Sequence, residues 1–158
     1  MNSTPAQARI DLAAIRHNVA LLRELADGAE LMGAVKADAY GHGLVPASLA
    51  ILEGGATRLG TALISEGLAL RAAGVTGPVL SWLVSPGEPI AEALLADLEL
   101  SASDAGLLEE IAGAARRTGR VARVHLEADT GMSRGGAPLA AWPALLRKAL
   151  RLQAEGAV

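Results

Sequence analysis

Apolar and polar residues follow one another along this chain in patterns that predict alternating helices and strands. Apolar residues recur every three or four positions in segments where we expect helices, at 12–25, 44–52, 65–73, 90–95, 104–118 and 138–150. Short apolar runs bounded by glycine, proline or polar residues predict strands at 30–35, 58–62, 78–83, 98–102 and 121–127, with a brief extended segment at 9–12. Strands that alternate with helices in this way favour βαβ units and a parallel sheet.

Several helix ends carry recognisable signals. Asp11 and Asp104 stand directly before apolar periodic segments, where a carboxylate can accept hydrogen bonds from free backbone amides. Gly119 follows the longest of these segments and is expected to end it. The last helix is expected to carry its apolar stripe on Leu139, Trp142, Leu146 and Leu150.

The order of these elements favours one α/β architecture over another. No G-x-G-x-x-G fingerprint follows the first strand, and a lysine stands in that loop instead. We therefore expect a (β/α)₈ TIM-type barrel rather than a doubly wound sheet. The pattern accounts for about five βα units and the start of a sixth strand at 153–158, so the predicted barrel is incomplete.

Composition narrows the class of protein. Of 158 residues, 51% are apolar and 20% are charged, which is typical of a globular domain with a sizeable core. The net charge of -3 does not favour nucleic acid as a partner, and the absence of cysteine excludes disulfides and thiol chemistry. No apolar run reaches the roughly 20 residues of a membrane span, and the segment 1–7 lacks the apolar core of a signal peptide. A soluble, cytoplasmic protein is expected.

The most informative candidate for chemistry is Lys36, at the end of the first predicted strand. Burying a charged lysine next to a strand costs free energy. A lysine in this place therefore either extends its amine to water or serves as a nucleophile. Tyr40 lies four residues further on, and Gly41 and Gly43 allow backbone to approach a ligand closely. These features are typical of a site that holds a carbonyl cofactor as a Schiff base.

Two motifs carry a family resemblance. The string AVKADAYGHG, residues 34–43, resembles the cofactor-lysine motif of the alanine racemases. The segment His125–Arg134, HLEADTGMSR, resembles that family's later H-L-K-x-D-T-G-M-x-R segment, and the spacing between the two also agrees. The resemblance implies a pyridoxal 5′-phosphate enzyme on a barrel domain, which interconverts L-alanine and D-alanine and supplies D-alanine for peptidoglycan.

The resemblance also implies residue roles. Lys36 would bind pyridoxal 5′-phosphate covalently and act as the base at one face of the substrate Cα. Tyr40 would contact the cofactor phosphate. Arg134 would contact both the phenolic oxygen of the cofactor and the substrate carboxylate, a task that suits a planar guanidinium.

Glu127 departs from the family motif, which often has a carbamylated lysine at this position. A glutamate supplies a carboxylate directly, so a Glu127–Arg134 pair without lysine modification is predicted. An ordinary glutamate at a strand end is the alternative. Ser133 and Gly136 also depart from the usual pattern, which leaves the detailed geometry of the loop open.

The remaining polar candidates are expected to be structural. Neither His42 nor His125 is spaced with other ligands for a metal, and His17 lies on the first predicted helix. Asp38 and Asp129 are expected to cap or hold their loops. No metal site is predicted.

The resemblance implies that residues 1–158 form the N-terminal part of the barrel domain, without the later barrel strands and the β-rich C-terminal domain. Those parts would supply an active-site histidine, the arginine at the pyridine nitrogen, phosphate-binding loops and a tyrosine that is the second base in the partner subunit. We expect a homodimer at full length and an inactive protein from these residues alone, with exposed strand edges that favour aggregation. A broad-specificity or serine racemase and a non-catalytic pyridoxal-phosphate carrier are the alternatives.

Overall fold

The computed structural model describes residues 6–158, so most of the N-terminal segment in which no signal peptide was expected lies outside the described residues. Within them, a single parallel sheet has the strand order β1-β2-β3-β4-β5, which is also the order along the chain. The strands are β1 (Met32–Ala34), β2 (Arg58–Thr61), β3 (Val79–Ser81), β4 (Glu99–Ala102) and β5 (Val124–Leu126).

One helix precedes the first strand, one follows the last, and the others connect successive strands. The helices are α1 (Leu12–Leu25), α2 (Lys36–Gly41), α3 (Leu44–Glu53), α4 (Ile64–Ala72), α5 (Ile90–Leu95), α6 (Ala105–Thr118) and α7 (Trp142–Ala154). Asp11 accepts hydrogen bonds from Ala13 and Ala14 at the start of α1, and Asp104 does the same for Gly106 and Leu107 at the start of α6. Both predicted caps are therefore confirmed.

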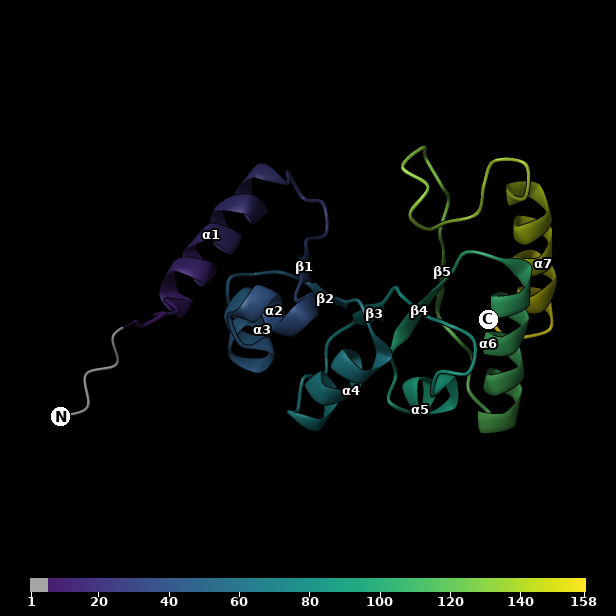
Figure 1. Ribbon diagram of the computed structural model, residues 1–158, viewed down its shortest axis with the longest axis horizontal. Helices are drawn as coiled ribbons and strands as arrows, with labels where there is room; N and C mark the ends of the chain where they lie inside the picture. The colour runs from purple at the N-terminus through teal and green to yellow at the C-terminus, as the bar shows by residue number, and fades with distance from the viewer. Residues whose placement is uncertain (1–5) are drawn as a thin grey trace.

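The strands and helices form an incomplete barrel, as predicted. Figure 1 shows α3, α4, α5 and α6 following the sheet along one side, while the loop between β5 and α7 rises on the other. The sheet order leaves β1 and β5 as its two edges. All strand pairs are parallel, so their carboxyl ends, where a barrel carries its active site, meet at one rim.

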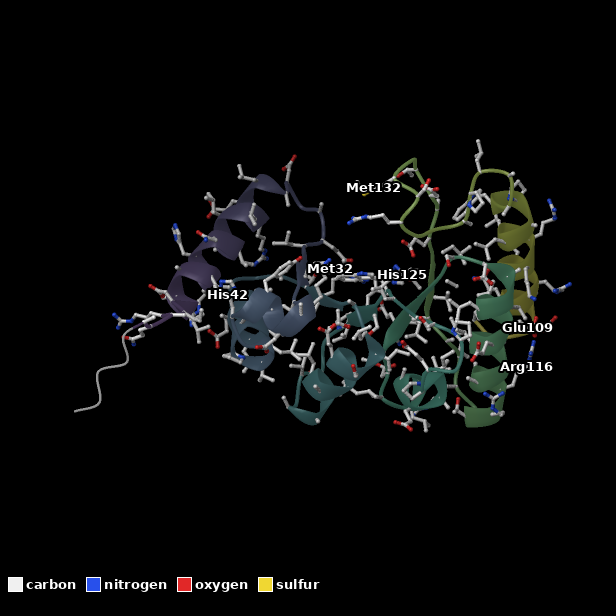
Figure 2. All side chains as sticks on the ribbon, viewed as in Figure 1. Met32, His42, Glu109, Arg116, His125 and Met132 are labelled. Carbon is white, nitrogen blue, oxygen red and sulfur yellow. The ribbon has the colours of Figure 1, made fainter. Side chains whose placement is uncertain are left out.

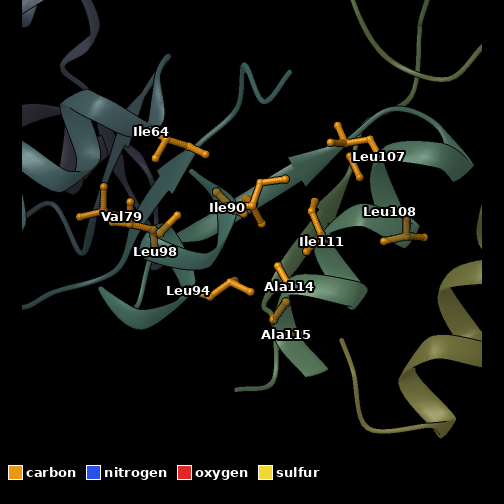
Figure 3. Packing of buried hydrophobic residues seen from close by; sticks show 14 of the residues in the cluster. Ile64, Val79, Ile90, Leu94, Leu98, Leu107, Leu108, Ile111, Ala114 and Ala115 are labelled. Atoms are coloured by element: carbon orange, nitrogen blue, oxygen red, sulfur yellow. The ribbon is translucent and has the colours of Figure 1, made fainter. Parts of the chain in front are cut away.

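The face of the sheet that meets the helices is apolar. Leu59 and Val79 from β2 and β3, and Leu100 from β4, are fully buried there. Figure 3 shows part of this core, in which Ile111, Ala114 and Ala115 of α6 lie close to Leu94 of α5. The small alanines, each with no exposed surface, let the helices pack closely in a core with almost no aromatic rings.

The opposite face of the sheet, which would be the barrel interior, is polar. Glu99 of β4 is only 6% exposed and accepts a hydrogen bond from Arg58 of β2 at 3.1 Å. The His125 Nε2 atom lies 2.7 Å from the same carboxylate. The Arg58 contact joins β2 to β4, two strands that are not neighbours in the sheet, whereas the His125 contact joins the paired strands β5 and β4.

Three predicted boundaries were wrong at the C-terminal end. The strand predicted at 121–127 is shorter in the structure, where β5 begins at Val124 and ends at Leu126. The helix predicted to start at residue 138 begins at Trp142. Pro143 marks that start, because proline suits the first turn of a helix. Leu139 precedes the helix and is 84% exposed, so it is not part of an apolar stripe.

The segment 153–158, predicted to start a sixth strand, forms no strand and makes one backbone hydrogen bond beside β5. α7 continues through Ala154, which removes the first part of the segment 153–158. The Ala157 carbonyl then accepts a hydrogen bond from the Ala122 amide at 3.0 Å, beside the start of β5. At the other end of the described chain, Arg9–Asp11 has no regular structure and Leu12 already belongs to α1.

None of the helices within residues 6–158 has the length and apolar character that crossing a membrane requires.

Candidate active site

Lys36 lies where the sequence predicts it, at the carboxyl end of the first strand. β1 ends at Ala34, and the next residue, Val35, is fully buried and donates its amide to the Gly60 carbonyl at 2.8 Å. The chain is thus held to the sheet up to the residue before Lys36. The lysine side chain is only half-buried, and its amine lies 5.7 Å from the ring centre of Trp82 in the next loop but one.

The segment after Lys36 has an unusual backbone. Four residues in succession, Ala37–Tyr40, have φ between 52° and 57° and ψ between 34° and 53°, which is the left-handed helical region. We call this segment the left-handed turn. A residue with a Cβ costs about 1–2 kcal/mol in this conformation, and runs of such residues are rare. Sequence analysis predicted a small turn here but not its handedness.

Polar groups hold the left-handed turn at both ends. The Asp38 carboxylate accepts a hydrogen bond from the Leu44 amide at 2.6 Å, at the start of α3. The His42 Nδ1 atom lies 2.8 Å from the Ala39 carbonyl. The amide of Ala37 donates to the Glu66 carboxylate at 2.6 Å. The prediction that Asp38 holds its loop is confirmed, and the contact of His42 agrees with a structural role.

A cavity of about 480 Å³ lies over the carboxyl ends of the strands. Lys36, Glu127 and Arg134 line it together. The other residues around it come from three loops and are Trp82, Leu83, Val84, Ser85, Ser103 and Gly135. Two cationic side chains and one carboxylate therefore face one space that is large enough for a small cofactor or substrate.

Arg134 belongs to a loop that is closed at its base. The Ala137 amide donates to the Glu127 carbonyl at 2.7 Å, and the Asp129 amide donates to the Ala137 carbonyl at 2.9 Å. Gly136 lies in this closure with φ of 89°, and a Cβ there would approach the Ala128 carbonyl carbon to 2.5 Å. The glycine that departs from the family pattern is therefore required by the backbone of this loop.

Asp129 organises the tip of the same loop. Its carboxylate accepts hydrogen bonds from the Gly131 amide at 2.9 Å and the Ser133 amide at 3.0 Å, and from the Ser133 hydroxyl at 2.8 Å. The hydrogen bond from the Gly131 amide, with those from Ser133, lowers the pKa of this carboxyl group. The prediction that Asp129 holds its loop is confirmed. Figure 2 labels Met132 at the exposed end of the loop.

The predicted Glu127–Arg134 ion pair is not formed within residues 6–158, although both side chains line the cavity. The Glu127 carboxylate instead lies against Gly135, where a Cβ would come within 3.0 Å of its Oε1 atom. The prediction of an ion pair was wrong because residue spacing alone does not determine whether two side chains come into contact.

Tyr40 lies beside Lys36 but not in the cavity. Its ring centre is 5.9 Å from the Lys36 amine, and the residue is 61% exposed. It is absent from the cavity lining in the described part of the chain. The left-handed turn therefore brings the two side chains together, as predicted, while leaving the phenol near the rim.

His125 is bound to Glu99 in the polar interior of the sheet, as described above. Among residues 6–158, no group of three or more acidic, histidine or cysteine side chains is arranged to hold a metal ion. His17 lies on α1, as the sequence indicates.

Sequence analysis missed two residues that shape the site. Trp82 forms a wall of the cavity, and its position directly after β3 is a signal that the barrel rule could have used. Glu66 contacts backbone amides in two loops, and no signal for this second contact exists in the sequence. Its place in the first turn of α4 indicates only a helix cap.

The fold and the site together define a class, namely an incomplete α/β barrel with a lysine and an arginine facing one cavity at the carboxyl ends of its strands. Within that class, the model of the alanine racemase N-terminal domain matches residues 10–157. The chain therefore belongs to the alanine racemase family.

Relatives support this membership. The chain is 59% identical over 151 residues to the alanine racemase of Frankia casuarinae. The aligned region covers 96% of this chain and 39% of that protein. It is 53% identical over 154 residues to the alanine racemase of Thermobifida fusca, covering 98% of this chain and 41% of that protein.

Solved structures agree. The alanine racemase of Streptomyces lavendulae, a producer of D-cycloserine, superposes with a TM-score of 0.95 at 47% identity, over 99% of this chain and 41% of that one. The alanine racemase of Streptomyces coelicolor superposes with a TM-score of 0.90 at 51% identity, over 93% of this chain and 40% of that one. The chain thus spans about 40% of the length of its relatives.

Proposed function

We propose that this chain is the N-terminal barrel part of a pyridoxal-phosphate-dependent alanine racemase. The observation that carries the proposal is the placement of the Lys36 amine and the Arg134 guanidinium around one cavity at the strand ends. The proposed activity is the interconversion of L-alanine and D-alanine in the cytoplasm, where it would supply D-alanine for the cell wall.

The side chains present suit the cofactor. An amine at the end of a buried strand can condense with an aldehyde, and Lys36 is the lysine in the cavity lining. Arg134 offers planar donors to the phenolic oxygen, and Tyr40 offers a phenol at the rim beside Lys36. When bound, pyridoxal phosphate supplies an electron-withdrawing system that acidifies the Cα–H bond of an amino acid.

The residues of this chain would then position the substrate and move one proton. The Lys36 amine, once released, would take or return a proton at one face of the substrate Cα. Arg134 would pair with the substrate carboxylate and fix which face is presented. Trp82, whose ring lies 5.7 Å from the Lys36 amine, would limit the water around that amine.

Trapping with borohydride tests the proposal directly. The full-length protein is incubated with pyridoxal phosphate, reduced and digested, and the modified peptide is identified by mass. We expect the label on Lys36, none after Lys36→Ala, and normal labelling after Lys148→Ala, since Lys148 forms an ion pair with Glu109 on the helix side. Label on other lysines only would refute the proposal.

Activity separates the remaining candidates. Circular dichroism of L-alanine and L-serine solutions follows racemisation, and we expect the signal of alanine to decay fastest with the homodimeric full-length enzyme. Equal decay for both amino acids would identify a broad-specificity racemase, and labelling without decay would identify a carrier. Residues 1–158 alone are expected to be inactive, because the second base would come from the partner subunit.

A further inference from the structure

The Glu66 carboxylate connects two neighbouring loops of the candidate active site. Its Oε2 atom accepts hydrogen bonds from the amides of Ala62 and Leu63, at 3.0 and 3.1 Å. Both amides lie at the start of α4, where free backbone donors need an acceptor. This half of the carboxylate therefore caps its own helix.

The other oxygen serves a different part of the chain. Oε1 accepts a hydrogen bond from the Ala37 amide at 2.6 Å, across 29 positions of sequence. This amide belongs to the peptide bond that directly follows Lys36, and Ala37 is the first residue of the left-handed turn. An ionised acceptor makes this the stronger kind of hydrogen bond.

We propose that Glu66 is a positioning residue for Lys36. By fixing the peptide plane after Lys36, it holds the lysine Cα in the orientation that sends the amine over Trp82 and into the cavity. A helix cap alone does not need the Ala37 contact, since Ala62 and Leu63 already satisfy one oxygen. The inference rests on the proposed function, because that function gives the Lys36 amine its role in cofactor binding.

The geometry allows the two tasks of Glu66 to be separated. In Glu66→Asp the carboxylate keeps its charge, but its arm is shorter by one bond of about 1.5 Å, so it cannot reach the α4 amides and Ala37 at the same time. The Ala37 amide, at 2.6 Å from the native oxygen, would then lie beyond hydrogen-bonding reach. Glu66→Gln keeps one neutral carbonyl oxygen and replaces the other acceptor by an NH₂ group, so its side chain can accept from only one of the two loops.

The matched control is Glu110→Gln. Glu110 also accepts a hydrogen bond from the backbone amide of a loop residue, Gly87, at 3.1 Å. That loop does not carry Lys36, so this variant reports the general effect of replacing a carboxylate that binds a backbone amide by a neutral amide side chain.

The experiment makes two measurements on the full-length protein and on the three variants. Hydrogen exchange without cofactor follows the amides of residues 37–43, and the rate of borohydride trapping with pyridoxal phosphate follows the reactivity of Lys36. For Glu66→Asp we expect exchange at Ala37 to accelerate about tenfold or more, as the loss of a charged hydrogen bond implies. For Glu66→Gln we expect a smaller acceleration, because its one remaining oxygen is neutral and makes the weaker hydrogen bond. Trapping at Lys36 should slow by a similar factor, while Glu110→Gln behaves like the wild type in both measurements.

The outcomes distinguish the inference from the proposed function. Unchanged exchange at Ala37 in both Glu66 variants would overturn the inference, whatever happens to trapping. Faster exchange with unchanged trapping at Lys36 would overturn it too, because the contact would then be structural only. If the wild type is not trapped at Lys36 at all, the proposed function fails. The part of the inference that assigns Glu66 to positioning the Lys36 amine then fails as well.

Discussion

Replacing Ala37 by glycine is expected to stabilise the protein, although glycine normally destabilises a helical segment. Ala37 has φ of 52° and ψ of 53°, a conformation in which the Cβ of an L-residue crowds the following carbonyl oxygen. Its side chain is exposed, so removal of the methyl group sacrifices little packing. The Ala37 amide donates to Glu66, and glycine retains that amide.

The magnitude follows from two opposing terms. Relief of the left-handed strain is worth about 1–2 kcal/mol for one residue. The additional backbone freedom of glycine in the unfolded chain costs about 0.5–1 kcal/mol. The net expectation is a gain of roughly 0.5–1 kcal/mol in the free energy of unfolding.

Ala69→Gly is the matched control. Ala69 is also exposed, but it lies in the right-handed helix α4, where the same change should cost about 1 kcal/mol. The two variants remove the same methyl group and add the same freedom to the unfolded chain. Their unfolding free energies should therefore differ by about 1.5–2 kcal/mol, because only the native backbone differs.

Urea unfolding followed by circular dichroism measures both variants under one set of conditions. Equal slopes and shifted midpoints would show that the change is in stability rather than in the unfolded ensemble. For a chain of this length the expected difference corresponds to about 3–8 °C in melting temperature. The reasoning is refuted if Ala37→Gly lowers the midpoint as much as Ala69→Gly does.

Three further predictions concern residues that lie next to the cavity lining. Gly60→Val should cost about 1–3 kcal/mol and move the fluorescence of Trp82, since even a Cβ at Gly60 would approach the Cζ3 atom of that ring to 2.6 Å; an unmoved emission maximum would contradict this. Gly136→Ala should open the base of the loop that carries the arginine, detected as faster exchange of the Asp129 amide, because the added Cβ meets backbone at 2.5 Å. The lowered pKa of Asp129 means that its stabilising effect is complete above the ordinary aspartate pKa, near 3.9, and disappears as pH falls through the lower native value. A titration of the Ser133 amide resonance should show that transition, and Asp129→Asn should abolish it.

Regular elements were predictable where local signals and periodicity agree. α6 begins after the carboxylate of Asp104 and ends at Gly119, which has φ of 65°, and both ends match the sequence prediction. The end of the chain was less predictable, because Leu139 fits a helical period while the loop before α7 holds it in solvent. Burial of a residue depends on neighbours that the local pattern does not contain.

The candidate site was predictable in its chemistry and less so in its contacts. Lys36 and Arg134 were identified from motifs, and the structure brings them to one cavity. The left-handed turn could not be predicted, since neither alanine nor tyrosine favours a positive φ. The contact of Glu66 with Ala37 joins residues 29 positions apart, so only the tertiary structure reveals it.

The left-handed turn is a product of tertiary structure rather than of its own residues. Four residues in this conformation cost about 4–8 kcal/mol, which no local preference of their side chains offsets. The groups that stabilise it come from elsewhere, namely the Gly60 carbonyl, the Glu66 carboxylate and the Leu44 amide. The orientation of Lys36 therefore depends on β2, which pairs with β1, and on α4, which supplies the Glu66 carboxylate. It follows that substitutions on α4, outside the cavity lining, can change the reactivity of the lysine without touching any bound molecule.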